Sequence, residues 1–159
     1  MRFAALFAFV VPALVAGPAA AASTVAPFAG LEGNWAGEGS ARLADGAVER
    51  LRCSASYAVS GGGHLDQTLD CAGDRSRFAF RNELDATGEA LLGAWRELTY
   101  RVEGGVSGRG EPGLLRVTAR GQAFSADATI ATHGARQAIE ITSRGGGFST
   151  ASIVMRRRR

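Results

Sequence analysis

A hairpin that specifies its own register is the feature that most restricts the fold of this chain. From Leu51 to Val59 the odd positions are apolar or cysteine and the even positions are mostly polar, the alternation of a half-buried strand. Gly61, Gly62 and Gly63 follow, and glycine adopts positive φ without steric cost. Folding the segment about Gly62 sets four pairs on one face: Cys53 with Cys71, Ala55 with Leu69, Tyr57 with Gln67 and Val59 with Leu65. One register therefore satisfies both the apolar pattern and a disulfide between the only two cysteines.

The first 22 residues predict export. Arg2 precedes an apolar run at residues 3–15, and a Gly-Pro break and small residues up to Ala22 follow. This is the layout of a secretory signal peptide cleaved after Ala21 or Ala22. An uncleaved membrane anchor is the alternative, because residues 3–22 nearly span a bilayer. We therefore expect the mature protein in the periplasm or outside the cell, where oxidising conditions favour a disulfide.

The charge balance argues against a nucleic-acid-binding face. The chain has 18 arginines, no lysine and 15 acidic residues. Removing Arg2 with the signal peptide, together with the four terminal arginines, leaves 13 basic and 15 acidic residues in the domain. Nucleic-acid sites need basic residues clustered on the fold itself. The run at residues 156–159 is expected to be a solvated tail, with attraction to anionic surfaces as the alternative.

Alternating segments separated by glycine turns continue along the chain and predict an all-β fold. After a loose leader at residues 23–29, we expect one domain at residues 30–156 and a basic tail at residues 157–159. Besides the hairpin, strands are expected near residues 33–43, 77–84, 91–96, 99–106, 115–120, 124–130, 139–141 and 148–155. This spacing favours an antiparallel up-and-down β-barrel of 8–10 strands, with a β-sandwich as the alternative.

A glycine-rich segment, Gly104 to Gly113, is expected to be a flexible connection between two strands. Its residues 108–113 match G-x-G-x-x-G, the pattern of a nucleotide-binding turn. That turn needs a following helix whose N-terminus binds phosphate, whereas an alternating strand follows Pro112 here. We therefore interpret the segment as a hairpin loop.

The two histidines, His64 and His133, each lie at a predicted turn. An axial haem or metal ligand at His133 is one interpretation, but no Cys, His or carboxylate cluster with ligand spacing accompanies it. Solvated turn histidines are favoured. We expect no catalytic residue, no metal site and no cofactor.

Large side chains on the predicted inner face form either a packed core or the lining of a ligand site. Gln67 belongs to the same face by alternation, and a buried amide requires a hydrogen-bond partner. The residues expected to line the interior are Trp35, Tyr57, Gln67, Phe78, Phe80, Trp95 and Phe124.

The segment LEGNWAGEG, residues 31–39, resembles the first strand of the calycin β-barrels, the lipocalins and their relatives. Gly33 and Trp35 match the G-x-W motif of these families, in which the tryptophan packs under one end of the barrel. An arginine of the last strand usually covers it; Arg156 or Arg157 is the candidate, and we assign Arg156 to barrel closure. The resemblance implies binding of a small apolar ligand, in a group that also includes haem binders and periplasmic protease inhibitors.

The leading hypothesis is an exported, non-enzymatic barrel that binds a small apolar molecule in its interior. The alternative is a protein-interaction module, such as an envelope-protein partner or a periplasmic enzyme inhibitor, with a solid core and Gly104–Gly113 as its contact segment. We expect no nucleic-acid partner and no stable membrane insertion after signal cleavage. The volume and lining of the interior distinguish the two hypotheses.

Overall fold

The structure is a computed structural model that describes residues 26–159. The predicted signal peptide at residues 1–22 lies outside the described residues, as do residues 23–25 of the predicted leader. The described chain forms ten strands: β1 Gly33–Leu43, β2 Val48–Ser60, β3 His64–Ala72, β4 Arg77–Thr87, β5 Ala90–Glu97, β6 Val102–Glu111, β7 Leu114–Gly121, β8 Ser125–His133, β9 Arg136–Arg144 and β10 Phe148–Arg157.

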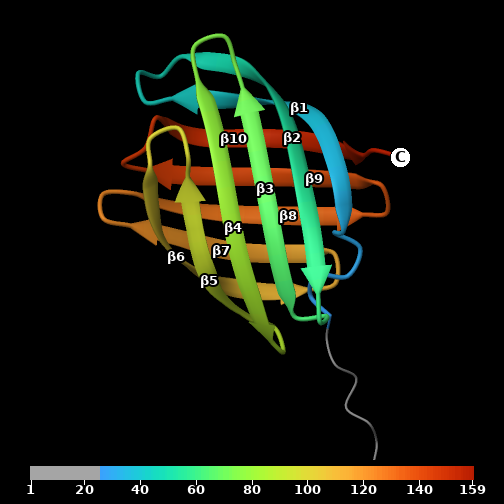
Figure 1. Cartoon of the computed structure of the whole chain (residues 1–159). Helices are drawn as coiled ribbons and strands as arrows, with labels where there is room; N and C mark the ends of the chain where they lie inside the picture. The colour runs from blue at the N-terminus through green and yellow to red at the C-terminus, as the bar shows by residue number, and fades with distance from the viewer. Residues whose placement is uncertain (1–25) are drawn as a thin grey trace, which may run out of the picture.

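The ten strands form one closed barrel (Figure 1). Each strand pairs antiparallel with the next along the chain, and β10 pairs with β1. Closure leaves no unpaired edge among these ten strands. The predicted up-and-down barrel is confirmed over the β-sandwich, and residues 26–159 contain no helix.

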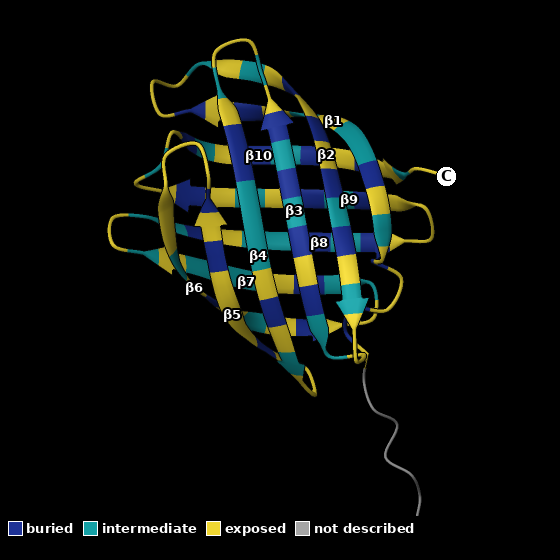
Figure 2. Cartoon of the chain, in the orientation of Figure 1, coloured by how far each residue is buried: buried dark blue, intermediate teal, exposed yellow. Residues whose placement is uncertain are grey.

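The hairpin of β2 and β3 has the predicted register. Cys53 lies opposite Cys71 and Tyr57 opposite Gln67, and the two cysteines form a disulfide. The turn between the strands uses positive φ at Gly61 and Gly62, as a tight connection requires. Buried and more exposed residues alternate along β2 (Figure 2), because successive side chains of a strand point to opposite faces.

The glycine-rich segment differs from the prediction. Most of Gly104–Gly113 belongs to strand β6 and is not a flexible loop. Its glycines permit close packing against β7: a Cβ added at Gly104 would lie 1.9 Å from the Arg120 carbonyl oxygen, and one at Gly108 would lie 2.1 Å from that of Arg116. Glycine within a strand often marks such close backbone approach or a sharp bend in a barrel. Strand β4 continues to Thr87, three residues beyond its predicted end at Leu84.

Residues 26–31 close one end of the barrel, in place of the loose leader expected up to residue 29. Phe28 and Leu31 are 1% and 2% exposed. The indole nitrogen of Trp35 donates a hydrogen bond to the Leu31 carbonyl at 2.8 Å. The buried ring of Trp35 therefore holds this segment in the barrel end.

The arginine that covers Trp35 is Arg157 rather than the assigned Arg156. Its guanidinium carbon lies 4.7 Å from the centre of the Trp35 ring, and its side chain donates a hydrogen bond to the Gly30 carbonyl. Strand alternation explains the correction: Met155 is buried and Arg156 is exposed, so Arg157 is the next residue on the inner face.

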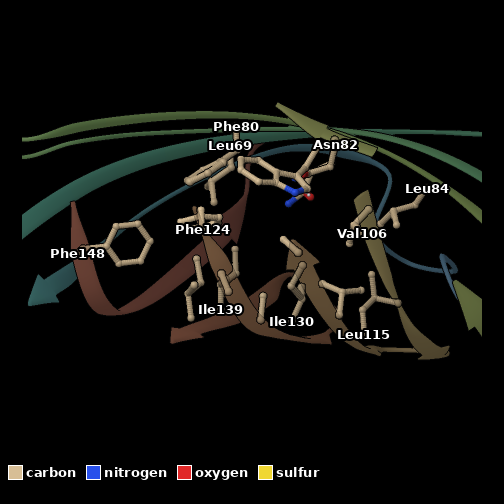
Figure 3. Close-up of a pocket in the computed structure, with 17 residues that line it drawn as sticks. Leu69, Phe80, Asn82, Leu84, Val106, Leu115, Phe124, Ile130, Ile139 and Phe148 are labelled. Carbon is tan, nitrogen blue, oxygen red and sulfur yellow. Dashed lines mark hydrogen bonds between the residues drawn. The ribbon is translucent and has the colours of Figure 1, made fainter. Parts of the chain in front are cut away.

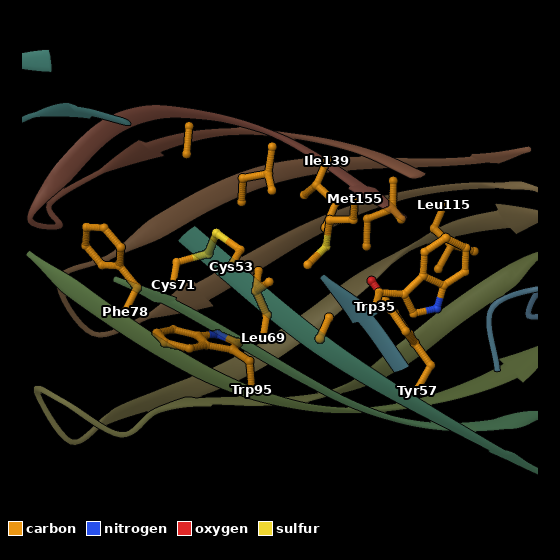
Figure 4. Packing of buried hydrophobic residues seen from close by; sticks show 14 of the residues in the cluster. Trp35, Cys53, Tyr57, Leu69, Cys71, Phe78, Trp95, Leu115, Ile139 and Met155 are labelled. Atoms are coloured by element: carbon orange, nitrogen blue, oxygen red, sulfur yellow. A yellow bond between two sulfur atoms is a disulfide. The ribbon is translucent and has the colours of Figure 1, made fainter. Parts of the chain in front are cut away.

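Trp35 is fully buried at the closed end of the barrel. Its ring meets Tyr57 edge to face, with ring centres 6.4 Å apart. Figure 4 shows these two rings at one end of the buried cluster and Phe78 with the disulfide at the other. Trp35 and Tyr57 therefore fill the closed end, and the two interior spaces described below are lined by other residues.

Replacing Cys53 and Cys71 together by alanine should lower the free energy of unfolding by roughly 3 kcal/mol, because the disulfide closes a loop of about 19 residues in the unfolded chain. Urea denaturation of the oxidised wild type and of the double variant measures the difference. Wild type with the disulfide reduced is the control and should resemble the variant. Equal stability of all three proteins would contradict a stabilising role.

Candidate functional site

The interior contains a cavity of about 80 Å³ between the walls formed by β3–β5 and β6–β10. Figure 3 shows its lining, which is aromatic at one end and aliphatic at the other. All but two of the 17 lining residues are apolar: Gln67, Leu69, Phe80, Asn82, Leu84, Trp95, Val106, Leu115, Val117, Ala119, Phe124, Ala126, Ala128, Ile130, Ile139, Ile141 and Phe148. We call this space the inner cavity.

A wider hollow of about 530 Å³ opens at the end of the barrel opposite Trp35. Residues 100–103, 121–124 and 145–148 contribute to its rim, and we call it the mouth hollow. The mouth hollow and the inner cavity share four lining residues, which are all aromatic: Phe80, Trp95, Phe124 and Phe148. These rings form the boundary between the two spaces.

Three of the shared rings contact one another, and two of these lie against glycines of the rim. Trp95 lies 5.0 Å from Phe124 and 6.5 Å from Phe80, measured between ring centres. A Cβ at Gly146 would lie 2.9 Å from the Phe124 ring, and one at Gly121 would lie 3.0 Å from the Trp95 ring. Glycine at these two positions therefore lets the rim loops lie directly on the aromatic boundary.

A row of polar side chains crosses the interior beside the inner cavity. Asn82 donates to Gln67 at 2.8 Å, Gln67 donates to the Tyr57 hydroxyl at 3.2 Å, and that hydroxyl donates to Gln137 at 2.8 Å. Gln137 completes the row by donating to Thr132 at 3.1 Å. The row joins β4, β3, β2, β9 and β8, and we call it the polar row.

The hydrogen bonds of the polar row offset the cost of burying its members. Tyr57 and Gln137 are 3% and 1% exposed. Burial raises the pKa of Tyr57 well above its ordinary value, since a buried phenolate is poorly solvated. The Tyr57 hydroxyl thus stays protonated and serves as a donor.

None of the described residues that line the inner cavity is charged. Strand β5 has one carboxylate, Glu97, and this residue lines the mouth hollow. Its two oxygens accept backbone hydrogen bonds from Ala79 at 2.9 Å and from Tyr100 at 2.6 Å. Glu97 therefore holds the β5–β6 turn in place.

The structure divides the seven predicted lining residues among three places. Four of them surround the inner cavity, namely Gln67, Phe80, Trp95 and Phe124. Phe78 lines the mouth hollow. Trp35 and Tyr57 belong to the packed end of the core and do not line the cavity.

Sequence reasoning did not identify Asn82, Gln137 or the aliphatic wall of β7–β9 as part of the site. The signal for Asn82 was present, because it lies two residues from Phe80 and from Leu84 and therefore on the same face of the strand. For Gln137 no local signal existed, since its partner Tyr57 is 80 residues away in the chain.

Both histidines lie outside these two spaces. His64 begins β3, and its Nδ1 is 2.7 Å from an Asp85 carboxylate oxygen, while His133 is exposed at the end of β8. Within residues 26–159 there is no group of three or more His, Cys, Asp or Glu side chains that could hold a metal ion. The same part of the chain contains no helix long and apolar enough to cross a membrane.

Comparison with protein-family models and with curated protein sequences found no match. Among solved structures, the barrel is similar to the crystal structure of Rv2717c from M. tuberculosis, with a TM-score of 0.69 and 12% sequence identity. The match covers 87% of this chain and 99% of that chain. At this identity the likeness concerns the fold alone. Kinship with the calycins, suggested by Gly33 and Trp35, stays a prediction.

Replacing Phe124 by alanine should open the aromatic boundary and expose Trp95 to solvent. Acrylamide quenching of tryptophan fluorescence is expected to increase, and the loss of stability should be smaller than the roughly 3–5 kcal/mol typical of fully buried Phe→Ala changes, because Phe124 is half-buried. Tyr100→Ala removes an exposed rim aromatic and serves as the control. Unchanged quenching in Phe124→Ala would show that Phe124 does not shield Trp95.

Replacing Asp85 by asparagine should lower the pKa of His64. The hydrogen bond and charge of Asp85, with a smaller contribution from Asp66, raise the pKa of His64 above its ordinary value. The His64–Asp85 pair therefore contributes its full stabilisation below about pH 6.5, the ordinary pKa of histidine. This stabilisation is lost as pH rises through the folded-state pKa of His64. An NMR titration tests this, with Glu83→Gln as the control; equal His64 titration in Asp85→Asn and wild type would contradict it.

Proposed function

We propose that this protein is an exported, non-enzymatic barrel that binds a small apolar molecule in the inner cavity. The observation that carries the proposal is an interior space lined almost entirely by aromatic and aliphatic side chains. Water in such a space forms few hydrogen bonds, so the transfer of an apolar molecule from bulk water into the cavity is favourable. The protein would then act by taking up and holding its ligand.

The shape of the two spaces limits the ligand. The inner cavity is smaller than common ligand sites of roughly 300–1,000 Å³, whereas the mouth hollow, at about 530 Å³, lies within that range. The shared aromatic residues make the two spaces neighbours. We therefore expect a ligand that is slender or small at its inner end and that extends past the Trp95 and Phe124 rings.

The lining also supports binding rather than catalysis. Among the described residues, its only polar side chains are the amides of Gln67 and Asn82, which neither ionise near neutral pH nor act as nucleophiles. Export is supported by the signal-like residues 1–22 and by the Cys53–Cys71 pair. Protein interaction stays a prediction, and the segment assigned to it, Gly104–Gly113, lies mostly in strand β6.

Uptake of the fluorescent apolar dye N-phenyl-1-naphthylamine tests the proposal. The wild-type protein should bind the dye and enhance its emission. Ala128→Leu fills the inner cavity with a larger apolar side chain and should weaken dye binding by roughly tenfold. A melting curve of each variant shows that the fold is retained.

The matched control is Ala58→Leu, which makes the same change at an exposed position on the outer face of β2. Its dye affinity should equal that of the wild type. If Ala128→Leu bound the dye as tightly as Ala58→Leu, the ligand would not occupy the inner cavity. A wild-type protein that took up no dye would refute apolar binding of this kind.

A further inference from the structure

We propose that the ligand of the inner cavity is electrically neutral and carries a hydrogen-bond donor, such as a hydroxyl group, which Asn82 receives. The proposal rests on the function proposed above and adds the chemical class of the ligand. It assigns to Asn82 a role in specificity. Its basis is one incompletely bonded amide, Asn82, in a cavity whose other described lining residues, apart from Gln67, are apolar.

Asn82 lies at the middle of the cavity wall. It follows Phe80 by two residues and precedes Leu84 by two, and it lies opposite Trp95 on the neighbouring strand. In Figure 3 its side chain occupies the upper wall, between the aromatic residues and the aliphatic Leu84, Val106 and Leu115. A ligand in the cavity therefore has to pass close to this amide.

The Asn82 amide has bonding capacity to spare. Its nitrogen donates one hydrogen bond, to Gln67 at 2.8 Å, whereas a primary amide offers two donors and two acceptor lone pairs. Among residues 26–159, no fully buried side-chain nitrogen or oxygen lacks a partner. The Asn82 oxygen, which has no partner in the described chain, is thus accessible from the cavity rather than enclosed by packed protein.

The direction of the polar row favours an incoming donor. Asn82, Gln67, Tyr57 and Gln137 all donate in the same sense along the row, which ends at Thr132. Hydrogen bonds in such a chain polarise one another. Donation by the Asn82 nitrogen makes its own carbonyl oxygen a stronger acceptor, and the free end of the row therefore suits a ligand O–H or N–H group.

The same lining disfavours an ionised ligand. A charged group in an apolar space requires an opposite charge or several hydrogen bonds to replace its hydration. Within residues 26–159, the lining of the inner cavity includes two amides and no charged side chain. Of these amides, Gln67 already uses its oxygen for Asn82 and its nitrogen for Tyr57. A neutral alcohol therefore fits the site better than the corresponding carboxylate.

A pair of isomeric probes tests the donor. 1-Octanol and heptyl methyl ether have the same atoms, but only the alcohol has an O–H group. Each probe displaces N-phenyl-1-naphthylamine from the wild type and from Asn82→Leu. The ratio of alcohol affinity to ether affinity should fall by roughly threefold to tenfold in the variant, the range expected for one hydrogen bond.

The control variant is Asn34→Leu, which makes the same replacement at an exposed residue of β1. Its alcohol-to-ether ratio should match that of the wild type. In wild-type protein, the Asn82 side-chain NMR signals should also shift more with 1-octanol than with the ether. This second measurement tests the contact even if Asn82→Leu does not fold.

Octanoate tests neutrality. At pH 8 it should displace the dye at least roughly tenfold more weakly than 1-octanol, and the difference should narrow near pH 4 as the acid becomes neutral.

An unchanged alcohol-to-ether ratio in Asn82→Leu, with unmoved Asn82 signals, would overturn the donor assignment. Equal binding of octanoate and 1-octanol at pH 8 would overturn neutrality. Both results leave apolar binding intact, whereas absence of dye uptake by wild type would overturn the proposed function and this inference together.

Discussion

The pairing of β1 with β10 is the constraint on which the rest of the structure depends. It closes the sheet, satisfies the last two strand edges and makes the barrel width a consequence of strand number. An eight-stranded barrel is just wide enough for its own side chains to fill. Ten strands enclose more room, so the size of the inward residues decides whether each level is solid or open.

Large and small side chains are distributed unevenly along that interior. Trp35, Phe28 and Leu31 fill one end, and Arg157 covers it. Toward the other end, the wall includes the small residues Ala119, Ala126 and Ala128, and the inner cavity remains. The polar row lies between these regions: Tyr57 contacts Trp35, while Gln67 and Asn82 face the cavity. A hydrogen-bonded row of buried side chains with one accessible amide oxygen is well suited to orient a ligand.

Local patterns predicted much of the fold and part of the site. The β2–β3 register, the disulfide and the first strand follow from alternation and turn residues, which act over a few positions. The glycines of β6 do not by themselves identify a flexible loop, because glycine is favoured both in flexible segments and where strands approach closely. The short distances from a Cβ at Gly104 or Gly108 to the carbonyl groups of Arg120 and Arg116 in β7 show that close approach is the reason here. Whether Arg156 or Arg157 covers Trp35 depends on which residues of β10 face inward. The buried Met155 shows that Arg157, two residues further on, shares the inner face.

The sequence by itself determined the inward face of each strand and the pairing of adjacent strands through short turns, because both depend on neighbouring residues. Only the tertiary structure decided which inward side chains meet across the barrel. Tyr57 meets Gln137 although 80 residues separate them, and Trp35 is fully packed while Asn82 borders open space. These outcomes depend on closure and on the stagger of all ten strands, a global geometry that no short segment of the chain encodes.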